Sequence, residues 1–186
     1  MRDYSVKIAD QLKQKLIFRE IDYEFVEAQG IFHFRYGGGE VLPQHDYLIL
    51  VGVNDLTLYA CLSARVEEKR RPIVGEFLHR ANYGLRAGNF ELDYKDGEIR
   101  YKYHVDLSDE NLSDEIFNKA LLLPVVMIRR YEGGLIAVML FDCMSAEEAV
   151  EIIENKTDEV EDDDEEDEEE YDEEEDDEYD EEDEED

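Results

Sequence analysis

The stretch NFELDYKDGEIRYKYH, residues 89–104, decides the fold of this chain. Apolar and polar residues alternate on both sides of Asp96-Gly97, a dipeptide typical of a two-residue hairpin turn. Such a turn predicts two antiparallel strands with one buried and one solvent-facing side. The predicted cross-strand pairs are Tyr94 with Ile99, Leu92 with Tyr101, Phe90 with Tyr103, Asp93 with Arg100, Glu91 with Lys102, and Asn89 with His104.

Two basic residues of this hairpin, Arg100 and Lys102, alternate with tyrosines as a nucleic-acid-binding stripe would. The predicted register places an acidic residue opposite each of them, so their charges are balanced within the hairpin. We therefore expect no nucleic-acid partner.

A second hairpin is predicted upstream, where apolar runs at 47–53 and 56–62 flank Asn54-Asp55. Its predicted pairs are Val53 with Leu56, Val51 with Leu58, and Ile49 with Ala60. The opposite face is also rich in apolar residues, namely Leu48, Leu50, Tyr59 and Cys61. A strand pair of this kind is expected at the centre of a sheet with both sides covered, either by a helix or by a partner subunit. A homodimer is one of these two possibilities.

Helical periodicity appears on both sides of the hairpins. Residues 3–20 repeat apolar positions every four residues, with Asp3 as the expected cap. Pro72 suits the first position of a helix that runs to Leu85. Ser145 to Glu148 matches the S-x-x-E capping box and predicts a short final helix.

Two regions complete the folded part. Short strands are expected at 23–26 and 31–36, followed by a glycine-rich loop that runs to Pro43. From the expected cap at Asn111 to Phe141, the apolar spacing is mostly helical but is interrupted by Pro124 and Gly133-Gly134. The pattern leaves open one helix or, within this region, two strands around the glycines.

The last 29 residues, 158–186, contain 26 of the chain's 53 acidic residues. Like charges repel and few side chains there could be buried, so nothing offsets the cost of ordering, about 1–2 kcal/mol per residue. Outside this run, 27 acidic residues face the chain's 19 Lys and Arg, and the net charge is only about −8 of the total −34. We therefore predict a folded domain at 1–156 and a disordered polyacidic tail at 157–186.

No reaction centre is visible in the sequence. The four histidines lack metal-ligand spacing, and phosphate-binding loops and nucleophile elbows are missing, so we predict no catalytic residue, no metal and no cofactor. Cys61 and Cys143 have apolar surroundings typical of buried thiols in a reducing compartment. The chain is expected not to be an enzyme.

The N-terminal residues lack the apolar core of a secretory signal. The most apolar segment, 120–141, carries Arg129, Arg130 and Glu132 at its middle, where each charge would cost roughly 2.5–3.5 kcal/mol in a bilayer. We expect a cytoplasmic protein with no membrane association.

Four motifs together resemble the YbjN-domain family: LHRANYGLRAGNFELDY (78–94), DGEIRYK (96–102), RYEGGLIAV (130–138) and SAEEAV (145–150). The resemblance spans most of residues 4–154 and excludes the acidic tail. It implies an α+β domain of the type III secretion chaperone-like kind, with helices packed on an antiparallel sheet and a helix over 111–141. Glu132 stands where the family usually has a proline. The family is described mainly as sensory-transduction regulators, and it offers no catalytic residues to transfer.

The predicted function is a non-enzymatic protein-binding module, a regulator or chaperone-like adaptor with an unidentified protein partner. One alternative makes the tail a polyanion that captures basic proteins or folds back onto basic residues of the domain. A solvating tail without a partner is another alternative, and an enzyme has no support in the sequence. The candidate tail-interacting residues are Arg65, Lys69, Arg70, Arg71, Arg129 and Arg130.

Overall fold

The computed structural model describes residues 3–37, 44–108 and 111–163. It divides into two units, Met1–Ile153 and Glu154–Asp186, of which the first holds the sheet. The elements in chain order are α1 (Val6–Phe18), β1 (Tyr23–Val26), β2 (Ile31–Tyr36), β3 (His45–Val51), β4 (Asp55–Arg65), the 3-10 turn η1 (Glu68–Arg70), α2 (Arg71–Gly84), β5 (Asn89–Leu92), β6 (Glu98–Asp106), α3 (Asp114–Leu140) and α4 (Ala146–Asp163).

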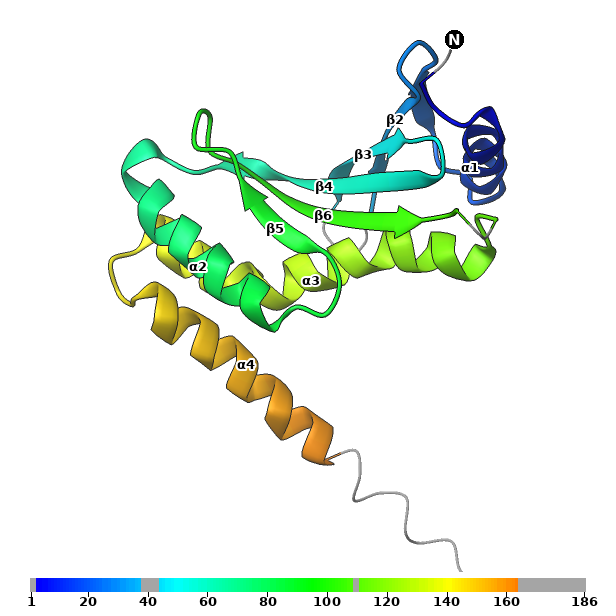
Figure 1. Cartoon of the computed structure of the whole chain (residues 1–186). Coiled ribbons are helices and arrows are strands. Elements are labelled where there is room, and N and C mark those ends of the chain that lie inside the picture. The colour runs from blue at the N-terminus through cyan, green and yellow to red at the C-terminus, as the bar shows by residue number, and fades with distance from the viewer. Residues whose placement is uncertain (1–2, 38–43, 109–110, 164–186) are drawn as a thin grey trace, which may run out of the picture. The chain divides into compact units, whose positions relative to one another are not determined.

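The strands form one antiparallel sheet in the order β1-β2-β3-β4-β6-β5. The helices α2 and α3 lie against the same side of this sheet (Figure 1). The predicted α+β architecture is therefore confirmed, as is the central position of the β3–β4 hairpin. α3 covers one face of that hairpin, but in the described part of the chain no helix covers the other.

Both hairpin registers differ from the predicted ones by two residues. In β3–β4, Val51 pairs with Leu56, and the loop is Val53-Asn54, closed by a 2.8 Å hydrogen bond from the Gly52 N–H to the Asp55 carbonyl. Val53, predicted to face the core, is instead 63% exposed. The apolar faces stay where they were predicted, because a shift of two residues leaves the alternation unchanged.

The hairpin of β5 and β6 has a four-residue loop, 94–97, instead of a two-residue turn, and Leu92 pairs with Ile99. The Asp93 and Asp96 side chains accept hydrogen bonds from the Lys95 and Glu98 N–H groups and stabilise this longer loop. Only Gly97 in it has a positive φ, whereas a type I′ turn needs two such residues.

The helix ends correct two predicted caps. α1 is capped by Ser5 rather than Asp3, and α3 by Ser113 rather than Asn111; in each, the hydroxyl accepts from the N–H three residues on. The predicted capping box of Ser145 and Glu148 is present at α4. α3 is one helix through Pro124 and both glycines, which settles the open choice between helix and strands.

Two further predictions concern the C-terminal part and the thiols. α4 continues to Asp163, so the predicted domain boundary at residues 156 and 157 falls within a helix. Residues 164–186 of the predicted tail lie outside the described residues.

Cys61 is buried as predicted, but Cys143 is exposed, because it lies in the turn between α3 and α4.

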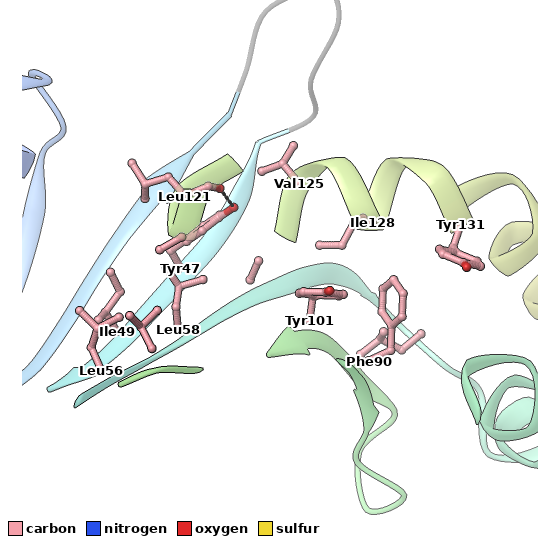
Figure 2. Packing of buried hydrophobic residues seen from close by; sticks show 14 of the residues in the cluster. Tyr47, Ile49, Leu56, Leu58, Phe90, Tyr101, Leu121, Val125, Ile128 and Tyr131 are labelled. Carbon is pink, nitrogen blue, oxygen red and sulfur yellow. Dashed lines mark hydrogen bonds between the residues drawn. The ribbon is translucent and has the colours of Figure 1, made fainter. Parts of the chain in front are cut away.

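The core lies between the sheet and the helices (Figure 2). Tyr47 of β3 is fully buried, and its hydroxyl donates a 2.8 Å hydrogen bond to the Leu121 carbonyl of α3. Towards the other end of the sheet, Phe90 makes edge-on contacts with Tyr101 and Tyr131. These contacts fix α3 against the strands and leave its opposite side facing outward.

The adjacent glycines of α3 give a matched stability test. A Cβ on Gly134 would lie 2.7 Å from Ile153 and 2.9 Å from Phe77, whereas a Cβ on Gly133 meets no atom within 4 Å. We expect Gly133→Ala to raise the free energy of unfolding by about 0.5–1 kcal/mol and Gly134→Ala to lower it by about 1–3 kcal/mol. Urea unfolding of the two variants at low protein concentration measures both, and equal effects would contradict this account of α3.

Candidate functional site

The described residues contain no cluster of three or more His, Cys, Asp and Glu side chains that could hold a metal ion. Burial, the largest influence, raises the pKa of the Cys61 thiol to about 11, so this side chain stays protonated and is a poor nucleophile at neutral pH. The helices within the described ranges also fall short of the length and apolarity that crossing a membrane requires.

The predicted tail-interacting residues do not form one patch. The four basic residues in and next to η1 already have partners in the domain. Three of them lie beside a carboxylate: Arg65 beside Glu98 at 2.7 Å, Lys69 beside Glu67 at 3.0 Å, and Arg70 beside Asp142. The fourth, Arg71, donates a 2.8 Å hydrogen bond to the Tyr94 carbonyl. Arg129 and Arg130 lie on α3, about three helical turns before it ends at Leu140. The structure thus separates the six residues into two groups.

The open face of the sheet carries charges that neutralise one another. Arg100 lies 2.7 Å from Glu91 and stacks over the Tyr59 ring at 4.2 Å, and Lys102 lies 3.4 Å from the same carboxylate. Lys102 was predicted directly opposite Glu91. In the structure it lies opposite Asn89 and contacts Glu91 diagonally across the two strands. Both basic residues therefore share the Glu91 carboxylate, and the absence of a nucleic-acid partner stays a prediction.

The outward side of α3 is apolar along most of its length. Its exposed apolar side chains, which we name the α3 stripe, are Leu122, Val126, Ile136 and Leu140, between 42% and 64% exposed. Their spacing places them on one side of the helix, opposite the buried residues. Gly133 and the exposed Arg129 lie on the same side. A helix that is apolar on both sides is expected to be covered on both.

A pocket of about 300 Å³ lies beside the α3 stripe, between α3 and the ends of β3 and β4. Its apolar walls include Leu62, Ile128 and Met139, and its polar groups include His45 and Glu132. His45 is only 7% exposed, and neither ring nitrogen has a hydrogen-bond partner in the described structure. An unpaired buried polar group costs about 1–3 kcal/mol, so this arrangement needs an explanation.

Burial lowers the pKa of His45 below its ordinary value of 6.5, against the raising influence of Glu132 and of the nearby Cys61 backbone. The imidazole is therefore neutral at neutral pH. A neutral imidazole has one N–H donor and one acceptor nitrogen, and His45 is one of the few polar residues that line this pocket. This pocket can hold a small molecule or side chain with a polar end.

The lowered pKa of His45 predicts a pH dependence. As the pH falls from about 7 to about 5.5, the unfolded chain takes up a proton at this residue that the folded chain resists, so the free energy of unfolding drops. The slope from this one residue does not exceed about 1.4 kcal/mol per pH unit. His45→Phe should flatten this part of the profile. A profile identical to that of the unchanged chain would contradict the assignment.

The sequence pattern predicted neither the α3 stripe nor the burial of His45 in the neighbouring pocket. The α3 stripe could have been recognised from the near-continuous apolar run of 120–128 and 134–141, but its outward direction depends on which side the sheet occupies. His45 carries no local signal, because its burial depends on the β2–β3 register that pairs it with Tyr36.

These observations define an α+β domain with an exposed apolar helix face and, in the described residues, no cluster of side chains that could hold a metal ion. The chain belongs to the YbjN family, described as "Putative bacterial sensory transduction regulator", whose model matches residues 9–131. Among solved structures it is similar to one described as "YbjN, a putative transcription regulator from E. coli", with 13% identity and a TM-score of 0.47 over 69% of this chain and 96% of that one. No curated protein matches the chain.

Proposed function

We propose that this protein is a non-enzymatic regulatory module that acts by binding protein, and that the α3 stripe is its contact surface. The observation that carries the proposal is this row of four exposed apolar side chains on a helix whose other side forms the core. Exposed apolar rows of this kind are characteristic of interaction surfaces. The family's description as a regulator agrees with a binding role.

The composition of the stripe favours a helix as the bound element. Gly133 leaves an open space in the middle of the row, and a glycine within a helix costs about 1 kcal/mol without improving any contact here. A missing side chain at a helix surface lets a second backbone or a large side chain approach closely. The open space at Gly133 is therefore explained if another helix crosses α3 near this residue.

A second copy of α3 fits this surface. Leu122 and Leu140 lie at equal distances in sequence from Tyr131, and so do Val126 and Ile136. In an antiparallel pair whose two-fold axis passes at the level of Tyr131, Leu122 of one copy meets Leu140 of the other. Val126 meets Ile136 in the same way, so each apolar residue meets an apolar residue. Arg129 likewise lies at the same distance from Tyr131 as Gly133, so its long side chain enters the space that the glycine leaves. Such self-complementarity is what a two-fold interface requires.

Sedimentation equilibrium of the full chain tests this function. We expect a monomer–dimer equilibrium that strengthens with added salt, because each copy has a net charge of −34 and salt screens their repulsion. A chain that stays monomeric up to about millimolar concentration at high salt would contradict the pairing.

The polyacidic tail supports a second candidate function, a polyanion that captures basic proteins, on the observation that 26 of its last 29 residues are acidic. Association through the tail would weaken steeply as salt is added. Added salt should weaken association through the tail and strengthen association through the α3 stripe. The direction of the salt effect therefore distinguishes the two candidate functions. For the fold-back version, the tail would have to compete with acidic side chains of the domain that already lie beside Arg65, Lys69 and Arg70.

A further inference from the structure

We propose that the pocket beside the α3 stripe binds a small neutral amphiphile, with a short aliphatic body and a primary amide or hydroxyl head held by His45. The pocket shares Ile136 and Leu140 with the α3 stripe, but all the residues that line it belong to one copy of the chain, so ligand contacts do not require a second copy.

The shape and lining of the pocket select the aliphatic body. Its volume of about 300 Å³ is at the small end of the range for ligand sites, roughly 300–1,000 Å³. Side chains of α3 and β4 form its apolar walls: Leu62, Ile128, Leu135, Ile136, Met139 and Leu140. Apart from His45, Glu132 and Gln44, these walls offer few polar side chains, so a short chain fits and a sugar or nucleotide does not.

The polar groups select the head. His45 is buried with both ring nitrogens unpaired, and as a neutral imidazole it can donate one hydrogen bond and accept another. Glu132, on α3, offers only acceptor oxygens when ionised. A primary amide or hydroxyl both donates and accepts, so it can satisfy an imidazole nitrogen and the carboxylate together. A carboxylate head would instead face Glu132 with a like charge and no cation to balance it.

Protein-observed NMR on the full chain, with hexanamide as the probe and hexanoate as the matched control, tests this site. Hexanamide should saturably shift the His45 ring signals and the methyl signals of Ile136 and Met139, and hexanoate should bind at least about tenfold more weakly. His45→Phe should reduce hexanamide affinity by about tenfold or more. Equal affinity for the two probes, or no saturable shift at these residues, would overturn the proposal.

A second variant keeps the test informative if His45→Phe does not fold. Glu132→Gln removes the repelling charge while preserving shape, so hexanoate should bind this variant more tightly and the preference for hexanamide should shrink several-fold. An unchanged preference would mean that Glu132 does not face the ligand head. Val53→Glu, in the β3–β4 loop at the opposite end of the hairpin from His45, does not line the pocket and should leave hexanamide binding unchanged; a loss in this variant would overturn the assignment of binding to this pocket.

Discussion

Replacement of Phe77 by alanine is expected to lower the free energy of unfolding by about 3–5 kcal/mol. Phe77 is fully buried on α2, and its ring meets that of Tyr131 on α3 edge-on, with 6.3 Å between centroids. It also lies against Gly134, so its removal opens a cavity where α2 and α3 meet. The surrounding structure relaxes only partly around a cavity of this kind.

Tyr83→Ala is the matched control, because Tyr83 is an aromatic residue of the same helix and is 96% exposed. It should change stability by less than about 0.5 kcal/mol. Urea unfolding followed by circular dichroism compares the two variants. A loss below about 1 kcal/mol for Phe77→Ala would mean that α2 does not pack on α3 as described.

Val126→Glu should weaken self-association by about a hundredfold or more without unfolding the chain. In the proposed pair, Val126 is buried against Ile136 of the second copy near the middle of the interface, where an unpaired carboxylate would lose its water. In the single chain the side chain is 49% exposed, so the free energy of unfolding should change by less than about 0.5 kcal/mol.

Val53→Glu controls for the added charge, because it makes the same chemical change at a residue 63% exposed in the β3–β4 loop, away from α3. Sedimentation equilibrium of both variants at one salt concentration measures their dimer dissociation constants. A larger effect of Val126→Glu than of Val53→Glu shows that the position of the new charge matters, and not only its presence. Equal weakening by the two would assign the effect to general repulsion and remove the α3 stripe from the interface.

The alternation of apolar residues predicts the faces of the sheet well but not its registers. In both hairpins the true pairing is shifted by two residues, and a shift of two keeps every side chain on the same face. The turn residues Asn54-Asp55 and Asp96-Gly97 favoured two-residue loops. In the structure, side chains of Asp93 and Asp96 stabilise a longer loop at 94–97, which Arg71 and Tyr94 fix to the start of α2.

The candidate sites were harder to predict, because they depend on how elements far apart in sequence pack. The apolar residues of 120–141 indicated a core element, which is correct for one side of α3 only. His45 starts a strand next to a loop and has no sequence motif, and its burial follows from packing against α3. The basic residues were visible in the sequence, but their acidic partners were not.

Distances between spin labels on two copies of α3 test the central claim most directly. With the exposed Cys143 replaced by serine, single labels at Glu115→Cys and Lys119→Cys lie on the helix before the α3 stripe and should not disturb it. An antiparallel pair centred on Tyr131 predicts separations of about 48 Å and about 36 Å, from a rise of 1.5 Å per residue. Distances near 10–20 Å at both positions would indicate a parallel pair. The lack of any distance between copies would show that the α3 stripe does not bind itself. Either result contradicts the antiparallel pairing of α3.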